Sequence, residues 1–445
     1  MTARPRRLAH DALETAATEV AVLAIGLLTG IVTARLLGPH QRGLFSLCGV
    51  FPTTLAILVK LGVGPANVYF LRRERAAPGA VLANSVVLAL AVGAATVGLV
   101  LLFRAPLLST VMRDAQPIHL LVLLPLVPST VLQSYLFGIL QGEGRFRTFN
   151  RRSLWQALAT LLGMALVLGA LGLGLLGALV VSVAVHVGVT LWVLGTTLRL
   201  VPLRAVRPDR DLLGRTLRFG LKSHVQALAA HLHARVDLYM LAYFLTPTEV
   251  AFYAIATRLA ELLFLVPQSL GVALYPRLAG HDPGAADALT ARACRVVASV
   301  AVPAAAALVL GGPWLLTRVY GTAYAAAAEP LRLLVPATCF MSLYFLLSRS
   351  FTSRNRQEIN LLAAGVALGG NVALNSVLIP RLGTVGAAAS SLVSYGLAAA
   401  ILAIVFLRSS RLRVRDLLLP RAADFTAAVA GVVGTRRAVA GQPSR

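Results

Sequence analysis

Residues 217–280 decide the fold of this chain, and their sequence is LRFGLKSHVQALAAHLHARVDLYMLAYFLTPTEVAFYAIATRLAELLFLVPQSLGVALYPRLAG. Two apolar helices, each long enough to cross a bilayer, are predicted on either side of the turn at Thr246–Glu249. The first carries lysine, histidine, arginine and aspartate side chains, and the second carries Arg258, Glu261 and Gln268. A charge at the centre of a bilayer costs about 3 kcal/mol, so these groups must face water, a partner charge or a ligand. We therefore expect the functional site in this stretch.

The composition indicates a membrane protein. Of the 445 residues, 58% are hydrophobic and only 13% are charged, which is more apolar than a soluble domain of this size can bury. The net charge is +24, but the basic residues lie in short loops between apolar runs, as membrane topology requires. No nucleic-acid partner is therefore expected. The three cysteines follow no metal-binding or disulfide spacing, so no metal site is expected.

Apolar runs of about 20 residues predict an all-α polytopic protein with about twelve transmembrane helices. The predicted spans are residues 13–37, 44–70, 80–103, 118–141, 153–174, 176–198, 217–245, 250–275, 293–316, 331–350, 359–380 and 384–407. Arginine is denser in alternate loops, beginning with the N-terminal segment. The positive-inside rule then predicts a multi-pass protein of the inner (cytoplasmic) membrane with both termini in the cytoplasm.

The two halves of the chain resemble each other. Ala34–Pro39 matches Ala242–Pro247 at an offset of 208 residues, and Gly144–Arg145 matches Asn355–Arg356 at an offset of 211. Both offsets cross six predicted helices, which predicts two six-helix bundles related by a pseudo-two-fold axis, with the substrate between them. The predicted parts are a basic N-terminus (1–12), a first bundle (13–200), a cytoplasmic linker (201–216), a second bundle (217–408) and a basic cytoplasmic tail (409–445).

Several short motifs occur in an order and spacing that resemble the polysaccharide (O-antigen and exopolysaccharide) flippases of the multidrug/oligosaccharidyl-lipid/polysaccharide (MOP) exporter superfamily. They include Ala34–Pro39, Gly142–Arg145, Arg235–Asp237, Tyr275–Arg277 and Gly383–Ala387. The resemblance implies a MATE-like fold that opens alternately to either side of the membrane. The chain departs from many relatives in its helix count, since these have fourteen helices.

The function that the resemblance implies is transport, with no enzyme activity. The expected substrate is a lipid-diphosphate-linked oligosaccharide, moved to the outer leaflet for lipopolysaccharide or exopolysaccharide biosynthesis. The expected partners are this lipid-linked oligosaccharide, membrane lipids, and a polysaccharide polymerase or glycosyltransferases of the same pathway.

Four cations are the candidate ligands of the diphosphate: Lys60, Lys222, Arg235 and Arg258. Each lies within a predicted span, where an uncompensated charge is costly. A diphosphate supplies about two negative charges and many acceptor oxygens, and arginine can bind such oxygens with a bidentate fork. Lys60 has no acidic neighbour in its span, which favours a functional role for it.

A second set of polar residues is predicted to line the cavity or to couple transport to an ion: Asn67, Gln226, His233, Asp237, Glu261 and Gln268. At 100° per residue, Gln226, His233 and Asp237 share one helix face with Lys222. The coupling ion would be H⁺ or Na⁺, and no other cofactor is expected. Alternatively, Asp237 and Glu261 have a purely structural role and pair with Arg235 and Arg258.

Two alternatives with the same fold remain open. A peptidoglycan lipid-precursor flippase would share the need for cations that bind a lipid diphosphate. A multidrug/cation antiporter would need acidic residues, and only Asp237 and Glu261 lie deep in the second half. A membrane glycosyltransferase or polymerase is disfavoured. Such enzymes need acidic residues on an external loop, or a sizeable external loop, and the predicted topology has neither.

Overall fold

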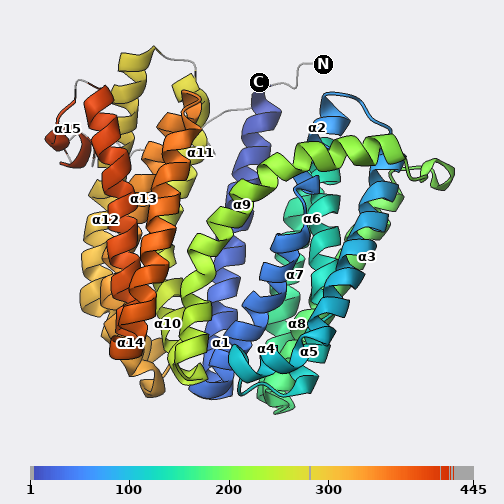
Figure 1. Ribbon diagram of the computed structural model, residues 1–445, viewed down its shortest axis with the longest axis horizontal. Helices are drawn as coiled ribbons and strands as arrows, with labels where there is room; N and C mark the ends of the chain where they lie inside the picture. The colour runs from blue at the N-terminus through green and yellow to red at the C-terminus, as the bar shows by residue number, and fades with distance from the viewer. Residues whose placement is uncertain (1–4, 280–281, 411, 420, 422–423, 425–445) are drawn as a thin grey trace, which may run out of the picture. The chain divides into compact units, whose positions relative to one another are not determined.

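The structure is a computed structural model that describes residues 5–279, 282–410, 412–419, 421 and 424. Every regular element in this part of the chain is a helix (Figure 1), which confirms the predicted all-α class. The elements are α1 (Pro5–Val59), α2 (Val63–Arg72), α3 (Pro78–Leu102), α4 (Arg104–Thr110), α5 (Pro117–Leu123), α6 (Leu126–Gly142), α7 (Phe146–Met164), η1 (Ala165–Ala170), α8 (Gly174–Leu198), η2 (Leu203–Ala205), α9 (Arg210–Phe244), α10 (Pro247–Ala260), η3 (Glu261–Phe264), α11 (Leu265–Ala279), α12 (Pro283–Val319), η4 (Thr322–Ala327), α13 (Ala328–Ser353), α14 (Gln357–Ser409) and α15 (Val414–Leu418).

The helix count agrees with twelve spans. Within the described residues, nine helices are long and apolar enough to cross a membrane, and α9 is not among them. Two of the nine are bent: α1 at Gly38 (φ 70°) and α14 at Gly383 (φ 58°). Glycine adopts a positive φ without steric cost, and each bend falls between two predicted spans. Counting α1 and α14 as two spans each and adding α9 gives the predicted twelve.

The predicted span 44–70 is not one continuous helix, and this corrects the expectation for Lys60. Helix α1 ends at Val59 and α2 begins at Val63, with Leu61 (φ 50°) and Gly62 (φ 66°) in left-handed conformations between them. Leucine rarely adopts a positive φ, so tertiary contacts must hold it there. Gly220 of α9 packs against this break, since a Cβ atom there would lie 2.5 Å from the Leu61 carbonyl oxygen. Lys60 therefore lies in the break rather than in mid-helix.

The predicted span 250–275 also changes geometry in its middle. Helix α10 passes into η3, a 3₁₀ turn over Glu261–Phe264, before α11 resumes the α-helix. Pro267 has no N–H to donate to the carbonyl of residue 263, so the α-helical hydrogen-bond pattern is incomplete at this point. The irregular turn thus lies directly before this proline.

Contacts divide the chain into two compact units. Unit 1 comprises the described residues up to Arg235 together with Thr246–Ala251, and unit 2 comprises Val236–Leu245 and the described residues from Phe252 onward. The boundary between the units falls inside α9, between Arg235 and Val236. The predicted linker 201–216 lies earlier in the chain, and its last residues already form the start of α9 at Arg210. The predicted domain boundaries remain a prediction.

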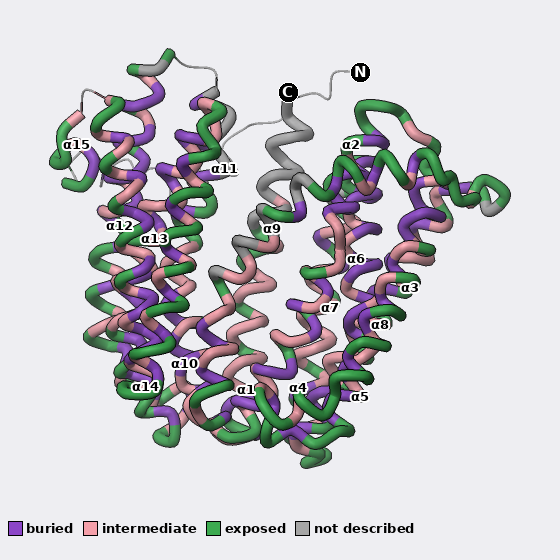
Figure 2. The backbone as a smooth tube through the Cα atoms, in the orientation of Figure 1, coloured by how far each residue is buried: buried purple, intermediate pink, exposed green. Residues whose placement is uncertain are grey.

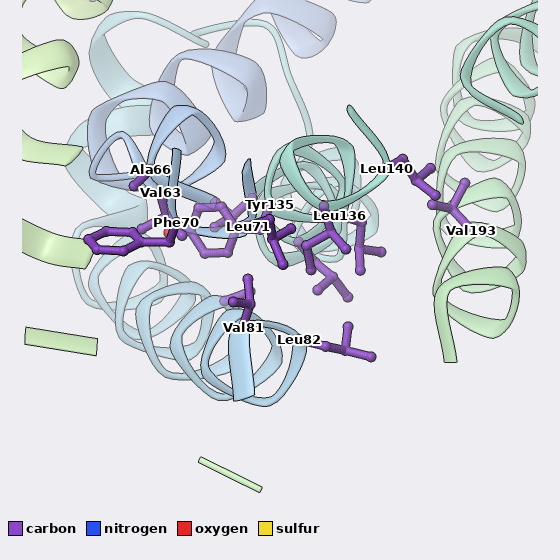
Figure 3. Packing of buried hydrophobic residues seen from close by; sticks show 14 of the residues in the cluster. Val63, Ala66, Phe70, Leu71, Val81, Leu82, Tyr135, Leu136, Leu140 and Val193 are labelled. Carbon is purple, nitrogen blue, oxygen red and sulfur yellow. The ribbon is translucent and has the colours of Figure 1, made fainter. Parts of the chain in front are cut away.

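Each unit has an apolar core. In unit 1, side chains from α2, α3, α6 and α8 pack together, among them Phe70, Leu82 and Tyr135 (Figure 3). In unit 2 the core includes Phe351 of α13 and Phe406 of α14.

Buried and exposed residues alternate along α12 and α14 (Figure 2), so each helix turns one face to its own unit's core and the other outward. For spanning helices the outward face is the one that lipid would cover.

Small residues allow α2 and α6 to approach closely in unit 1. A Cβ atom on Gly138 would lie 2.1 Å from the carbonyl oxygen of Gly64, and one on Gly64 would lie 2.9 Å from the carbonyl oxygen of Ser134. Membrane helices commonly associate through glycine in this way, because dispersion contacts replace the hydrophobic drive that water supplies to soluble proteins.

Part of the C-terminal segment docks on unit 2. Arg295 of α12 lies 2.9 Å from Asp424, and both side chains are nearly buried. Burial would raise the pKa of Asp424, but the Arg421 backbone N–H and the Arg295 guanidinium together lower it. Leu417 of α15 joins the apolar core of the unit. Most of the predicted tail 409–445 lies outside the described residues.

Candidate functional site

Helix α9 carries most of the predicted polar stripe, but only part of it can be examined. The side chains of Lys222, Gln226 and His233 lie outside the described residues. Asp237 is described and is buried, with 6% of its surface exposed. It belongs to unit 2, whereas Arg235, two residues earlier, belongs to unit 1.

Asp237 accepts three hydrogen bonds from neutral side chains of unit 2. Its Oδ1 accepts from Asn375 Nδ2 at 2.7 Å. Its Oδ2 accepts from the Tyr253 hydroxyl at 2.8 Å and from Ser391 Oγ at 2.5 Å. Asn375 and Ser391 lie on either side of the Gly383 bend of α14, so the bend brings two turns of one helix to the same carboxylate. Asn371 Oδ1 accepts from Asn375 Nδ2 at 2.9 Å and extends the cluster.

This geometry contradicts the alternative in which Asp237 pairs with Arg235. Within the described residues, no lysine or arginine donates a hydrogen bond to the Asp237 carboxylate. The buried Nδ2 of Asn371 and Oδ1 of Asn375 have no hydrogen-bond partner. The three donated hydrogen bonds stabilise the buried carboxylate without a cationic side chain.

Helix α9 carries Arg235, and two of its histidines contact α1, which ends directly before Lys60. His231 Nε2 lies 2.8 Å from Thr54 Oγ1. His224 lies two helical turns earlier on α9 and is buried. Its Nε2 atom is 3.0 Å from the Leu58 carbonyl oxygen, close to the break after α1. The break that contains Lys60 therefore lies beside α9.

The other predicted residues of the second half lie near η3 in unit 2. Arg258 donates to Glu261 at 3.3 Å, which confirms the predicted pair. Their side chains are 55% and 39% exposed, so solvent screens the attraction and the pair contributes little to stability. Gln268 is also exposed. Because Arg258 is exposed, it is accessible to an anionic ligand.

Asn67 lies elsewhere than the sequence indicated. It is buried in the core of unit 1, where its Nδ2 donates to Ser85 Oγ at 2.9 Å and to the Tyr135 carbonyl at 3.2 Å. This placement favours a role in joining α2, α3 and α6. A continuous helix would place Asn67, seven residues after Lys60, on the same face as Lys60, but the break at Leu61 and Gly62 removes that register.

The sequence reasoning missed a buried arginine in unit 1. Arg152 of α7 is 9% exposed, and its Nη2 donates to the Oε1 atoms of Gln133 and Gln156, both at 2.7 Å. Its guanidinium lies 4.2 Å from the centre of the Phe137 ring. Within the described residues Arg152 has no carboxylate partner, so neutral oxygens and an aromatic face compensate its charge.

The Arg152 network continues to α8. Gln156 Nε2 lies 3.3 Å from His186 Nδ1, and His186 Nε2 lies 3.1 Å from Thr130 Oγ1. The spacing of Arg152 and Gln156, four residues apart on one helix face, was a signal that could have revealed the network. From hydropathy alone, Arg152 resembles a loop residue, because it directly follows Arg151 in an arginine-rich stretch before an apolar run.

Comparison with known proteins identifies the family of this chain. Residues 9–280 match the family model described as "Polysaccharide biosynthesis protein". The chain belongs to this family. Residues 228–377 also match the MatE model, which confirms the resemblance to the MOP superfamily and covers the Asp237 cluster up to Asn375.

A curated relative of this family member is the probable low-salt glycan biosynthesis flippase Agl15 of Haloferax volcanii. The two are 22% identical over 177 residues, a match that spans 39% of this chain and 38% of that protein. The chain therefore matches well under half the length of this relative.

Solved structures show the same fold. The lipid II flippase MurJ, in an inward closed conformation, superposes with a TM-score of 0.77 at 12% identity, covering 97% of this chain and 93% of that one. An inward-facing multidrug resistance MATE family transporter of the MOP superfamily superposes with a TM-score of 0.67 at 17% identity, covering 87% and 94%.

Proposed function

We propose that this protein is an alternating-access flippase that moves a lipid-diphosphate-linked oligosaccharide from the cytoplasmic to the outer leaflet for polysaccharide biosynthesis. The observation that carries the proposal is the match to the polysaccharide biosynthesis family over residues 9–280. The glycan flippase named among its relatives supports the same substrate class. Its partners are then the lipid-linked oligosaccharide, membrane lipids, and a polymerase or glycosyltransferases of the same pathway. Transport of this kind makes and breaks no covalent bond, so no enzyme chemistry is proposed.

Lys60 and Arg235 of unit 1, Arg258 of unit 2, and Lys222 are proposed to bind the diphosphate. The contacts of His231 with Thr54 and of His224 with Leu58 support this role, because they bring α9, which carries Arg235, to the end of α1 before Lys60. The exposed Arg258 supports it in unit 2. Gln226, His233, Glu261 and Gln268 are proposed as polar residues of the transport cavity.

Asp237 is proposed as the coupling site for H⁺ or Na⁺. Its support is the buried carboxylate with three neutral donors and, beside it, the unpartnered oxygen of Asn375. Binding a cation there would neutralise the charge, and the contacts of Asp237 with the two halves of α14 on either side of Gly383 would then change with occupancy.

The same buried acid is the observation that favours the runner-up function, a multidrug/cation antiporter. Ion-driven movement of a cationic drug, without movement of lipid-linked saccharide, would identify that alternative.

Replacing Lys60 by methionine is expected to weaken binding of lipid-linked oligosaccharide about ten- to a hundredfold. Methionine keeps the length and apolar stem but removes the charge, and a charge-assisted hydrogen bond contributes about 1.5–3 kcal/mol. The measurement is binding of a lipid-diphosphate-linked oligosaccharide to the purified protein in vesicles.

Lys60→Arg serves as the matched control because it keeps the cation, and Arg258→Ala tests the second unit in the same assay. The amount of folded protein is not expected to fall, since a partly buried charge is removed. Unchanged affinity in both Lys60→Met and Arg258→Ala would contradict the diphosphate site.

The proposed topology places both termini on the cytoplasmic side of the inner membrane. After the three native cysteines are replaced by serine, a single cysteine at Arg210 is expected to react with a membrane-impermeant maleimide only in inside-out vesicles. A cysteine at Pro247 is expected to react only in intact cells or right-side-out vesicles. The reverse labelling pattern would contradict the positive-inside assignment.

A further inference from the structure

A cavity of about 400 Å³ opens at one end of unit 1, away from every residue assigned above. Three turns of the chain line it: the segment after the Gly38 bend, the turn before α5, and the turn between η1 and α8. Its polar lining comes from His40, Gln41, Gln116 and His119. Figure 1 shows α4 and α5 at this end of the unit, opposite α2. In the proposed topology this end faces the outside of the cell.

His119 is the one nearly buried polar side chain of the cavity, at 8% exposed. A reciprocal hydrogen-bond pair orients it: the Gln116 side chain accepts from the His119 backbone N–H, and the Gln116 backbone N–H donates to His119 Nδ1 at 3.1 Å. Because Nδ1 accepts a hydrogen bond, the proton of the neutral imidazole must be on Nε2. Nε2 is therefore a donor.

The His119 Nε2–H has no hydrogen-bond partner among the described residues, and it is not one of the fully enclosed polar atoms. It therefore reaches the cavity and is available to a ligand. Gly174 (φ 58°) lies beside Gln41, since a Cβ atom on it would stand 3.4 Å from Gln41 Oε1. Leu173 and Leu175 add apolar surface to the lining.

This chemistry selects one class of ligand. A metal ion would need the lone pair of Nε2, but moving the proton to Nδ1 would set two N–H groups against each other at Gln116. No lysine or arginine lines the cavity among the described residues, so a phosphate would find no full positive charge from these side chains to pair with. Two amides, two imidazoles and a leucine wall instead match the hydroxyls and the apolar C–H face of a sugar ring. The volume lies in the range of small-molecule sites.

We propose that this cavity is a saccharide subsite at the outer end of unit 1, in which His119 Nε2 donates to a sugar hydroxyl and Gln41 supplies an amide. The proposal rests on the proposed flippase function for the source of the saccharide. It assigns the transported glycan a contact on the exit side, separate from the proposed diphosphate site. Such a contact would retain the sugar while the lipid diphosphate leaves its cations.

The test measures sugar binding to the full-length protein, purified in a detergent without a sugar head group. Saturation-transfer NMR with glucose and N-acetylglucosamine is the readout, and inorganic phosphate is the competitor. His119→Asn keeps an acceptor toward the Gln116 N–H but removes the Nε2 donor, whereas His119→Gln places an amide N–H near the Nε2 position. We expect His119→Asn to lower sugar affinity about three- to tenfold, as the loss of one neutral hydrogen bond implies, and His119→Gln to retain it.

Gln41→Ala changes an exposed side chain and so tests the cavity without risk to the fold; it is expected to lower affinity similarly. Leu171→Ala, exposed and outside the lining, is the matched control and should bind sugar as the wild type does. Absence of sugar binding by the wild type, equal binding by Gln41→Ala and the wild type, or displacement of sugar by phosphate would each overturn the proposal. Because no transport is measured, sugar binding that depends on His119 and Gln41 would stand even if lipid-linked saccharide proved not to be moved.

Discussion

Asp237→Asn is expected to reduce ion-driven transport by about 5- to 150-fold, the range that corresponds to loss of a coupling free energy of about 1–3 kcal/mol. Asparagine has nearly the shape of aspartate, and its oxygen can still accept from Asn375 Nδ2. The hydroxyls of Tyr253 and Ser391 can rotate to accept from the new amide N–H. The fold is therefore retained, while the charge that attracts H⁺ or Na⁺ is lost.

The measurement is movement of lipid-linked oligosaccharide in vesicles under a proton gradient or a sodium gradient, each applied alone. The gradient that drives the wild type identifies the ion, and Asp237→Asn should no longer respond to it. Glu358→Gln is the matched control, because this acid of unit 2 is 68% exposed and its pair with Arg356 is screened by solvent. It should transport nearly as the wild type does. An Asp237→Asn protein that keeps both rate and ion dependence would leave Asp237 with a structural role alone.

Gly138→Ala is expected to cause the largest loss of stability, about 3 kcal/mol. The added methyl group would stand 2.1 Å from the carbonyl oxygen of Gly64, so α2 and α6 would have to separate. The obstructing atom belongs to the backbone, which cannot move aside as a flexible side chain can. The expected loss in the free energy of unfolding is therefore at the upper end of the range of about 1–3 kcal/mol that an added methyl group costs in a packed core. The measurement is the melting temperature of the purified protein.

Gly188→Ala in α8 is the matched control, since nothing lies within 4 Å of the position its Cβ atom would take. Alanine is a better helix former than glycine by about 0.5–1 kcal/mol, so this variant should melt at the same temperature or higher. Equal melting temperatures for the two variants would mean that α2 and α6 do not depend on close contact at Gly138.

The class of the protein, its helix count and its principal bends follow from the sequence by itself. Hydropathy is a property of each segment taken alone, because a bilayer acts on every segment with the same thickness and polarity. Glycine and proline likewise disturb a helix locally: Gly38 directly precedes Pro39, and Gly383 follows Pro380 by three residues, so both bends fall between predicted spans. The pair between Arg258 and Glu261 was predictable for the same reason, since one turn of helix separates them.

Only the tertiary structure decided the partners of the polar side chains. The donors to Asp237 include Asn375 and Ser391, which lie 138 and 154 residues away along the chain. The left-handed Leu61 depends on contact with Gly220 of another helix, and this break moved Asn67 out of register with Lys60. Arg152 resembles a loop arginine until α6 and α8 bring neutral acceptors to it. Hydropathy and periodicity describe one helix at a time, whereas a buried polar group depends on which faces of several helices meet.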